Sequence, residues 1–277
     1  MNIIEHKNEI ELIGVSDFDL QMTFECGQCF RWNGKNDHYI GVAHDRVLKI
    51  RKIDTSIFIS CNLDDYKSIW HDYFDLDRNY AEIRRHLCTD DFMYRATEFG
   101  KGIRLLRQDK WEALCSFIIS QNNNIPRIKS IIDMLCREFG DAIEFENKQY
   151  HSFPSASVFA NIDVKQLEPL RCGYRAEYII GAAKTIAGGV IDLDAMGSST
   201  PEIARTELKK IRGVGDKVAD CVILFGLHML DAFPIDVWMK RAVEKHYGPD
   251  FDPRIFAPYA GIAQQYIFHY MRTGEKR

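Results

Sequence analysis

The chain of 277 residues lacks the features that mark a membrane or secreted protein. Its apolar stretches are far shorter than the roughly 20 residues that a helix needs to span a bilayer. The start, Met1 to Lys7, carries an acidic residue and no apolar run of signal-peptide length. We therefore expect an intracellular protein without membrane contact, located in the cytoplasm or nucleoid if its source is bacterial.

The cysteines do not form a metal-binding pattern. Of the eight, only Cys26 and Cys29 are close together, and neither a second pair nor histidines follow at the spacing of a zinc finger. Aromatic residues follow this pair where a thioredoxin-like motif would begin a helix. We expect reduced thiols and no metal held by side chains.

A surplus of positive charge is also missing, because the formal net charge is −4. This argues against a large basic surface for nucleic acid. It does not exclude DNA, since helix N-termini and backbone N–H groups can hold phosphates without many basic side chains.

The first hundred residues have β character. Residues 39–43 and 46–51 form the two arms of a hairpin, and residues 55–61 continue the pattern. Short helical patterns then occupy residues 63–87. These segments predict an N-terminal domain with an antiparallel sheet over residues 1–100.

From about Gly102 the hydrophobic period changes to 3.6 residues. Three positions fit the starts of helices: Asp109 as an N-cap, Pro126 in a first turn, and Thr200 followed by Pro201. There is no internal repeat, low-complexity run or flexible linker. We predict a mostly helical domain over residues 101–277, packed on the sheet domain in an α+β fold.

The most informative segment is a tight turn between two helical patterns. Helical periodicity runs up to Ile211 and resumes at Val218, with Gly213-Val214-Gly215 between them. In such a hairpin the first N–H groups of the second helix point outward, and the glycines let another backbone approach. This arrangement binds phosphates without reading sequence. The alternative is a purely structural αα-hairpin, which many helical proteins contain.

Lys217 falls in the first turn of the second helix, beside the positive end of the helix dipole. Partial burial there would favour the neutral amine, which is the form that attacks a sugar carbon. Asp236 stands where a further helix starts, and it could cap that helix, stabilise the cation that develops when a glycosidic bond breaks, or do both. Most lysines are solvated surface charges, so a lysine alone does not predict catalysis. The prediction of a nucleophile depends on Lys217 and Asp236 occurring together.

The hairpin sequence Ile-Arg-Gly-Val-Gly-Asp-Lys-Val-Ala-Asp-Cys, with Phe-Pro-Ile-Asp-Val after it, resembles the helix–hairpin–helix glycosylases that carry a Gly/Pro-rich loop and a downstream aspartate. Within this superfamily the chain resembles the 8-oxoguanine DNA glycosylases, from Gly27 to Phe268. Further motifs agree with that branch in order and spacing, at residues 27–32, 102–109, 122–127, 173–176 and 259–264.

The resemblance implies a bifunctional DNA glycosylase and AP lyase that removes 8-oxoguanine from double-stranded DNA, preferentially opposite cytosine. Lys217 would be the Schiff-base nucleophile and Asp236 the catalytic carboxylate. The enzyme would be a monomer, would need no organic cofactor, and would lack the iron–sulfur cluster of endonuclease III relatives, because no cysteine follows Cys221. Backbone contacts to DNA would come from Gly213, Val214 and Gly215, and a structural cation could bind the carbonyls of Lys209, Ile211 and Val214.

An enzyme that acts on a base in a duplex must flip that base into a pocket. By resemblance, the carbonyl of Gly27 would recognise 8-oxoguanine, because N7 is an N–H donor in 8-oxoguanine and an acceptor in guanine. Cys221 and Phe268 would sandwich the flipped base, and Gln264 would read its Watson–Crick edge. On helical spacing alone, Cys221 and Phe268 would be ordinary core residues.

Asn122, Arg127 and Arg175 match the residues that contact the cytosine left behind, and Tyr174 matches the wedge that fills the gap. Without the resemblance, the asparagine would belong to a loop or cap and the arginines would be solvated charges. Trp238 stands where eukaryotic members of the family have a histidine that helps to hold a phosphate, so it receives no role.

Two alternatives remain open. A glycosylase of the same scaffold could act on an oxidised pyrimidine or an alkylated purine, although alkylation enzymes lack the lysine and the missing cluster disfavours the pyrimidine version. A non-catalytic module could use the hairpin only as a phosphate clamp, but it would not explain Lys217 together with Asp236.

Overall fold

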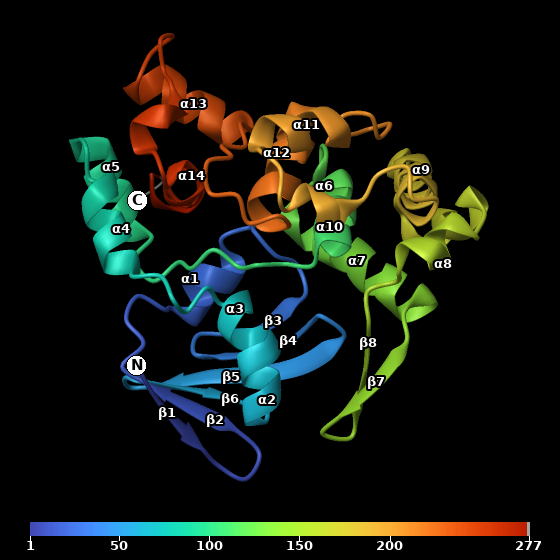
Figure 1. The fold of residues 1–277 in the computed structure, drawn as a ribbon, viewed down its shortest axis with the longest axis horizontal. Helices are drawn as coiled ribbons and strands as arrows, with labels where there is room; N and C mark the ends of the chain where they lie inside the picture. Colours follow the sequence, from blue (N-terminus) through green and yellow to red (C-terminus); the bar gives the residue numbers. More distant parts are fainter. Residues whose placement is uncertain (276–277) are drawn as a thin grey trace. The chain divides into compact units, whose positions relative to one another are not determined.

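The computed structural model describes residues 1–275. The chain forms two compact units, and neither is continuous in sequence (Figure 1). The α+β fold class is confirmed. The boundary expected after residue 100 stays a prediction, because each unit combines segments that are far apart in the chain. The first unit comprises Met1–Ile40, Leu48–Arg107 and Leu230–Arg277, and the second comprises Gly41–Val47 and Gln108–Met229.

A six-stranded antiparallel sheet has the strand order β1-β2-β6-β5-β4-β3. Its register places Ile59 opposite both Ile10 and Ile50, and all three side chains are fully buried. Alternate side chains of a strand point to the same face, so this register gives the sheet one apolar face. The predicted hairpin is confirmed as β4 and β5. The strands are β1 (Asn2–Glu5), β2 (Ile10–Ile13), β3 (Trp32–Lys35), β4 (His38–Ala43), β5 (Arg46–Ile53) and β6 (Ser56–Ile59).

Aromatic side chains form the centre of the first unit. Phe24 stacks on Trp32 with 4.2 Å between ring centroids, and Phe74 packs against both. The indole N–H of Trp32 donates to the Tyr73 hydroxyl at 2.7 Å, which satisfies a buried donor. Helical segments of this unit are α1 (Leu20–Glu25), α2 (Leu63–Asp65), η1 (Tyr66–Trp70), α3 (His71–Tyr73), α4 (Tyr80–Leu87), α5 (Asp91–Phe99), α13 (Val237–His246), η3 (Pro253–Phe256), α14 (Ala260–His269) and η4 (Tyr270–Gly274).

Two helices that are buried almost all round form the centre of the second unit. Residues 113–119 of α6 (Lys110–Ser120) and residues 218–225 of α12 (Asp216–Phe225) are all buried. A helix without a polar face must be covered by other elements, and α6 packs against α12, α7 and α9. The remaining elements are α7 (Ile125–Phe139), β7 (Ala142–Phe145), β8 (Lys148–His151), α8 (Ala156–Ala160), η2 (Val164–Leu170), α9 (Arg175–Ala187), α10 (Leu193–Met196) and α11 (Pro201–Leu208).

The predicted helix starts are confirmed in this unit. Asp109 accepts the N–H of Glu112 at 2.8 Å and caps α6. Pro126 lies in the first turn of α7, and Thr200 caps α11 directly before Pro201. Each cap satisfies an N–H group that the helix itself leaves unpaired, so the sequence fixes where these helices begin.

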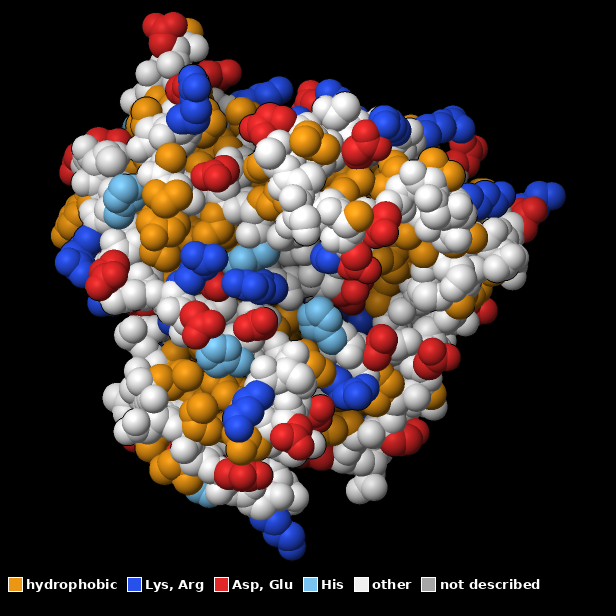
Figure 2. All heavy atoms as spheres, viewed as in Figure 1, with side chains coloured by type: hydrophobic (Ala, Val, Ile, Leu, Met, Phe, Trp, Pro, Cys, Tyr) orange, Lys and Arg blue, Asp and Glu red, His pale blue; other side chains and the backbone are white. Residues whose placement is uncertain are grey.

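The cysteines are free thiols, as predicted. Burial raises the pKa of Cys26 to about 11, so this member of the close pair stays protonated at neutral pH. Among residues 1–275, no helix combines the length and apolar character needed to cross a bilayer. On the face drawn in Figure 2, acidic and basic side chains are interspersed without a continuous basic area.

Candidate active site

The predicted hairpin joins α11 to α12 in the second unit (Figure 1). Gly213 has a φ of +88°, and a Cβ there would lie 2.3 Å from the ring of Tyr178, so the turn requires glycine. Among residues 1–275, no atom lies within 4 Å of a Cβ added at Gly215, and no side chain caps α12. The first N–H groups of α12 are therefore open to a phosphate.

Two ion pairs connect the helices of the hairpin. Arg205 on α11 donates to Asp220 on α12 at 2.6 Å, and Lys209 Nζ donates to Asp216 at 2.5 Å. Burial raises the pKa of Asp220, and the contact with Arg205 opposes that shift. The hydrogen bond from Lys209 lowers the pKa of Asp216. The carboxylates of Asp216 and Asp220 thus both form ion pairs that connect the two helices of the hairpin.

Lys217 lies in the first turn of α12, as predicted, and is half-buried. Its Nζ donates to the Oγ of Ser120 at 3.1 Å and lies 5.2 Å from the centroid of the Phe117 ring. The Ser120 hydroxyl gives its own proton to the Phe117 carbonyl at 2.8 Å. A hydroxyl has only one proton, so Ser120 can only accept from the lysine. This contact therefore uses an N–H of the amine and not its lone pair.

Three of the four predicted opposite-base residues form one cluster. Arg175 is buried and donates to the carbonyls of Gln121 at 2.8 Å and Asn122 at 3.0 Å. Its guanidinium lies 4.6 Å from the centroid of the Tyr174 ring, and Asn122 donates to the Tyr174 hydroxyl at 3.3 Å. Arg127 on α7 is exposed. The donors of Arg175 are thus already bonded to the protein's own backbone.

Two residues at this site, Ser120 and Gln121, were not predicted from the sequence. Besides the carbonyl contact above, Gln121 donates its side-chain Nε2 to the Gly213 carbonyl at 3.1 Å. The available signal is a polar pair that ends an apolar helix directly before the asparagine motif. Two of their partners, Lys217 and Gly213, lie more than 90 positions away, which the sequence does not indicate.

Gly27, in the first unit, follows α1 with a φ of +91°. The next side chain, Gln28, is fully buried and donates to the Arg104 carbonyl at 2.7 Å. Its oxygen accepts the N–H of Leu106 at 2.9 Å. Two motifs of the resemblance, at 27–32 and 102–109, are therefore joined by hydrogen bonds that fix the backbone beside Gly27.

Asp236 caps α13 as predicted, and its carboxylate accepts the N–H of Met239 at 2.9 Å. The residue is half-buried. Trp238 is also half-buried, and the guanidinium of Arg241 lies 5.1 Å from the centroid of its ring. The backbone N–H that Asp236 accepts fixes the orientation of its carboxylate at the end of the helix.

Gln264 and Phe268 lie on α14 in the same unit as Asp236. The Nε2 of Gln264 donates to the Pro234 carbonyl at 3.2 Å, whereas its buried Oε1 has no hydrogen-bond partner among residues 1–275. A buried acceptor without a partner costs free energy, so Gln264 has a polar atom to offer to a ligand. Phe268 is half-buried, and the guanidinium of Arg272 lies 5.4 Å from its ring centroid. Cys221 is buried on α12.

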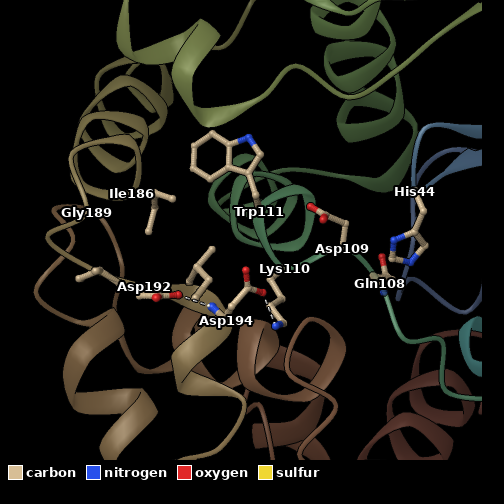
Figure 3. A pocket seen from close by; sticks show the side chains of 11 residues that line it. His44, Gln108, Asp109, Lys110, Trp111, Ile186, Gly189, Asp192 and Asp194 are labelled. Carbon is tan, nitrogen blue, oxygen red and sulfur yellow. Dashed lines mark hydrogen bonds and ion pairs between the residues drawn. The ribbon is translucent and has the colours of Figure 1, made fainter.

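A separate hollow of about 670 Å³ lies in the second unit (Figure 3). Its walls include Lys110 and Asp194, which form an ion pair at 2.5 Å. Asp109 and Asp192 also line it, and both cap helices. None of the predicted site residues lines this hollow, and these three carboxylates already have structural partners.

Two family models match consecutive parts of the chain. The model for the 8-oxoguanine DNA glycosylase N-terminal domain matches residues 12–114, and that for the HhH-GPD superfamily of base excision DNA repair proteins matches residues 115–254. The chain is 34% identical to a Saccharomyces cerevisiae N-glycosylase/DNA lyase over 266 residues, which cover 85% of this chain and 70% of that protein.

Solved structures agree with these matches. MBOgg1 in complex with a low-affinity DNA ligand has a TM-score of 0.94 and 44% identity, with 99% of each chain covered. The 8-oxoguanine glycosylase/lyase of Clostridium acetobutylicum, bound to DNA with cytosine opposite 8-oxoguanine, has a TM-score of 0.93 and 36% identity, again with 99% of each chain covered. The alternative of a non-catalytic module is therefore wrong. The chain belongs to the HhH-GPD superfamily of base excision DNA repair proteins, in its 8-oxoguanine DNA glycosylase branch, and is an N-glycosylase with DNA lyase activity.

Proposed function

We propose that this glycosylase removes 8-oxoguanine from double-stranded DNA, preferentially opposite cytosine, with Lys217 as its nucleophile and Asp236 as the partner carboxylate. The observation that carries the proposal is the position of the Lys217 amine. It lies at the open N-terminus of α12, directly after the glycine hairpin, and Ser120 holds it through an N–H. A hairpin that served only as a phosphate clamp would not need a half-buried lysine held in this way.

The reaction begins when the Lys217 nitrogen bonds to the anomeric carbon of the deoxyribose and the bond from that carbon to the base breaks. The base leaves with the bonding electron pair and takes up the proton that the amine loses as it bonds. Asp236 stabilises the positive charge that the sugar develops as this bond breaks. The lone pair of the nitrogen then opens the bond between the anomeric carbon and the ring oxygen, which takes up a proton from water, and a protonated Schiff base forms. This Schiff base makes a proton on the neighbouring carbon acidic, and the loss of that proton expels the 3′ phosphate by β-elimination.

Base recognition falls to Gly27, Cys221, Gln264 and Phe268. The Gly27 carbonyl would accept the N7–H of 8-oxoguanine and would oppose the N7 lone pair of guanine. An unmatched polar contact of this kind costs roughly 1–3 kcal/mol. The Oε1 of Gln264 has no hydrogen-bond partner within residues 1–275, which supports a role in reading the Watson–Crick edge, because that edge of the purine offers N–H donors. Cys221 and Phe268 would cover the two faces of the base.

On the opposite strand, Arg127 and Arg175 would donate to the O2 and N3 acceptors of the cytosine, and Asn122 would accept from its amino group. Tyr174, whose side chain is 49% exposed, would fill the gap that the flipped base leaves. The exposed guanidinium of Arg127 supports this assignment.

The DNA backbone would contact Gly213, Val214 and Gly215. A cation at the hairpin, held by the carbonyls of Lys209, Ile211 and Val214, would strengthen this contact by adding positive charge near the phosphate. The Ile211 carbonyl already accepts the N–H of Val214 at 3.0 Å, and its second lone pair fits it for a cation as well.

Trapping with borohydride tests the function directly, since it reduces a Schiff base to a stable cross-link. Duplex DNA with 8-oxoguanine opposite cytosine should become covalently linked to the unmodified protein. Lys217→Gln should abolish both trapping and excision while it keeps most of the lesion binding. Lys210→Gln is the matched control, because Lys210 belongs to the same hairpin but pairs with Glu207 at the surface. Normal excision by Lys217→Gln would overturn the assignment.

A further inference from the structure

Three consecutive residues at the end of α6 contact both the predicted nucleophile and the predicted opposite-base residues. Ser120 accepts from Lys217 at 3.1 Å. Gln121 and Asn122 accept from the buried Arg175 through their carbonyls, at 2.8 and 3.0 Å. All these residues lie in the second unit. A single short segment therefore links groups that act on opposite strands of the DNA.

Gln121 forms hydrogen bonds to two different parts of the unit. Its carbonyl faces Arg175, while its side-chain Nε2 donates to the carbonyl of Gly213 in the hairpin at 3.1 Å. The hairpin turn at Gly213 packs directly against the ring of Tyr178, which occupies the place where a side chain would start. Gln121 thus connects the opposite-base cluster to the turn that precedes Lys217.

The neighbouring residue, Asn122, has a φ of +46°, a conformation that is uncommon for a residue with a side chain. Arg175 holds this conformation by bonding to the carbonyls on both sides of it. If Arg175 turned to a cytosine, it would release the backbone at residues 121 and 122. The side-chain bond of Gln121 would then connect the change to the hairpin, and Ser120 would connect it to the amine of Lys217.

We propose that Gln121 is a positioning residue that couples the identity of the opposite base to the reactivity of Lys217. This inference rests on the proposed function, since it takes Arg175 as the reader of cytosine and Lys217 as the nucleophile. Gln121 itself touches neither DNA base in this scheme and acts through Gly213 and Arg175.

The simpler role for Gln121 is to cap the end of α6, because its Nε2 also donates to the Ile118 carbonyl at 3.2 Å. Asn123 offers a matched comparison. Its Nδ2 donates to the Ile119 carbonyl at 3.1 Å, at the same helix end. A pure capping role predicts that the two side chains have similar effects, whereas coupling predicts that only Gln121 affects base discrimination.

The experiment compares Gln121→Met with Asn123→Leu, which remove the amide groups at nearly constant shape. Single-turnover excision of 8-oxoguanine is measured opposite cytosine and opposite adenine, together with thermal unfolding of each variant. We expect Gln121→Met to lower the cytosine-to-adenine rate ratio roughly five- to tenfold, the effect of about one hydrogen bond. Asn123→Leu should leave the ratio unchanged while it lowers stability to a similar extent.

An unchanged ratio in Gln121→Met would overturn the inference, and so would an equal fall in Asn123→Leu. Failure of the proposed function shows itself differently, in the unmodified protein. If that protein removed the lesion equally well opposite both bases, the opposite-base assignment would fall and the coupling with it. A cytosine-to-adenine rate ratio in Gln121→Met equal to that of an unmodified protein that does prefer cytosine would remove the coupling alone.

Discussion

The Nζ of Lys217 and the Oγ of Ser120 are joined by a hydrogen bond of 3.1 Å in which the lysine is the donor. The direction is set by the Phe117 carbonyl, which takes the only proton of the hydroxyl. The serine therefore orients the amine without occupying the lone pair that would attack the sugar.

Ser120→Ala should slow excision roughly fivefold, because the loss of one hydrogen bond lets the amine adopt other orientations. Ser120→Thr keeps the hydroxyl and should restore most of the rate. Single-turnover kinetics and borohydride trapping on the same lesion DNA provide the measurement. An excision rate in Ser120→Ala equal to that of the unmodified protein would show that Lys217 needs no such support.

Asp236 caps α13, and two substitutions separate this role from the proposed catalytic one. Asn is as good an N-cap as Asp, so Asp236→Asn should keep the bond to Met239 while it slows excision by about 10²- to 10³-fold through loss of the charge. Asp236→Ala should slow excision as much and also lower stability by about 1 kcal/mol. Single-turnover rates and urea unfolding measure the two effects. An unchanged rate in Asp236→Asn would remove this carboxylate from the mechanism.

Arg127→Met should reduce excision opposite cytosine much more than opposite adenine. A good bidentate contact to a base contributes about 1–3 kcal/mol of discrimination, and the Watson–Crick edge of adenine has one acceptor where cytosine has two. Arg137→Met is the control, since Arg137 lies on the same helix and pairs with Asp133 at 3.0 Å. Equal losses opposite both bases would show that Arg127 contacts only the backbone.

His269, next to Phe268 on α14, makes stability depend on pH. Burial lowers its pKa to about 4, and Arg272 adds to the shift. The unfolded chain therefore binds a proton more readily between pH 6.5 and 4, so stability is highest above this window and falls as the pH drops through it, by up to roughly 3 kcal/mol. Urea unfolding at several pH values should show a shallower fall for His269→Leu than for His38→Leu, in which the exposed His38 serves as the control.

Local signals in the sequence predict much of this fold. The caps at Asp109 and Asp236, the start of α12 before Lys217 and the hairpin of β4 and β5 all depend on residues a few positions apart. Such features follow from backbone hydrogen bonds that neighbouring side chains satisfy.

Other elements are harder to predict from the sequence. All four side chains of β1 are exposed, so this edge strand has no alternation of apolar and polar residues to reveal it. The hairpin of β7 and β8 has a better signal, because Glu146 and Asn147 both have a positive φ in its turn, and asparagine favours such turns. The contacts of Ser120 and Gln121 depend on tertiary packing alone, and only the structure reveals them.

The bonds of Arg175 have a consequence for how the enzyme would select its substrate. In the structure this guanidinium is paired with carbonyls of the chain itself, those of Gln121, Asn122 and Cys172. If Arg175 reads the opposite base as proposed, that base must outcompete the polypeptide, not bulk water, for these donors. Selectivity would then be an exchange between two hydrogen-bonded states, and a base with poorly placed acceptors would leave the arginine on the carbonyls of the chain. The hydrogen bonds that Arg175 makes in the DNA-free protein would thus set the free energy that its contacts to each opposite base must exceed.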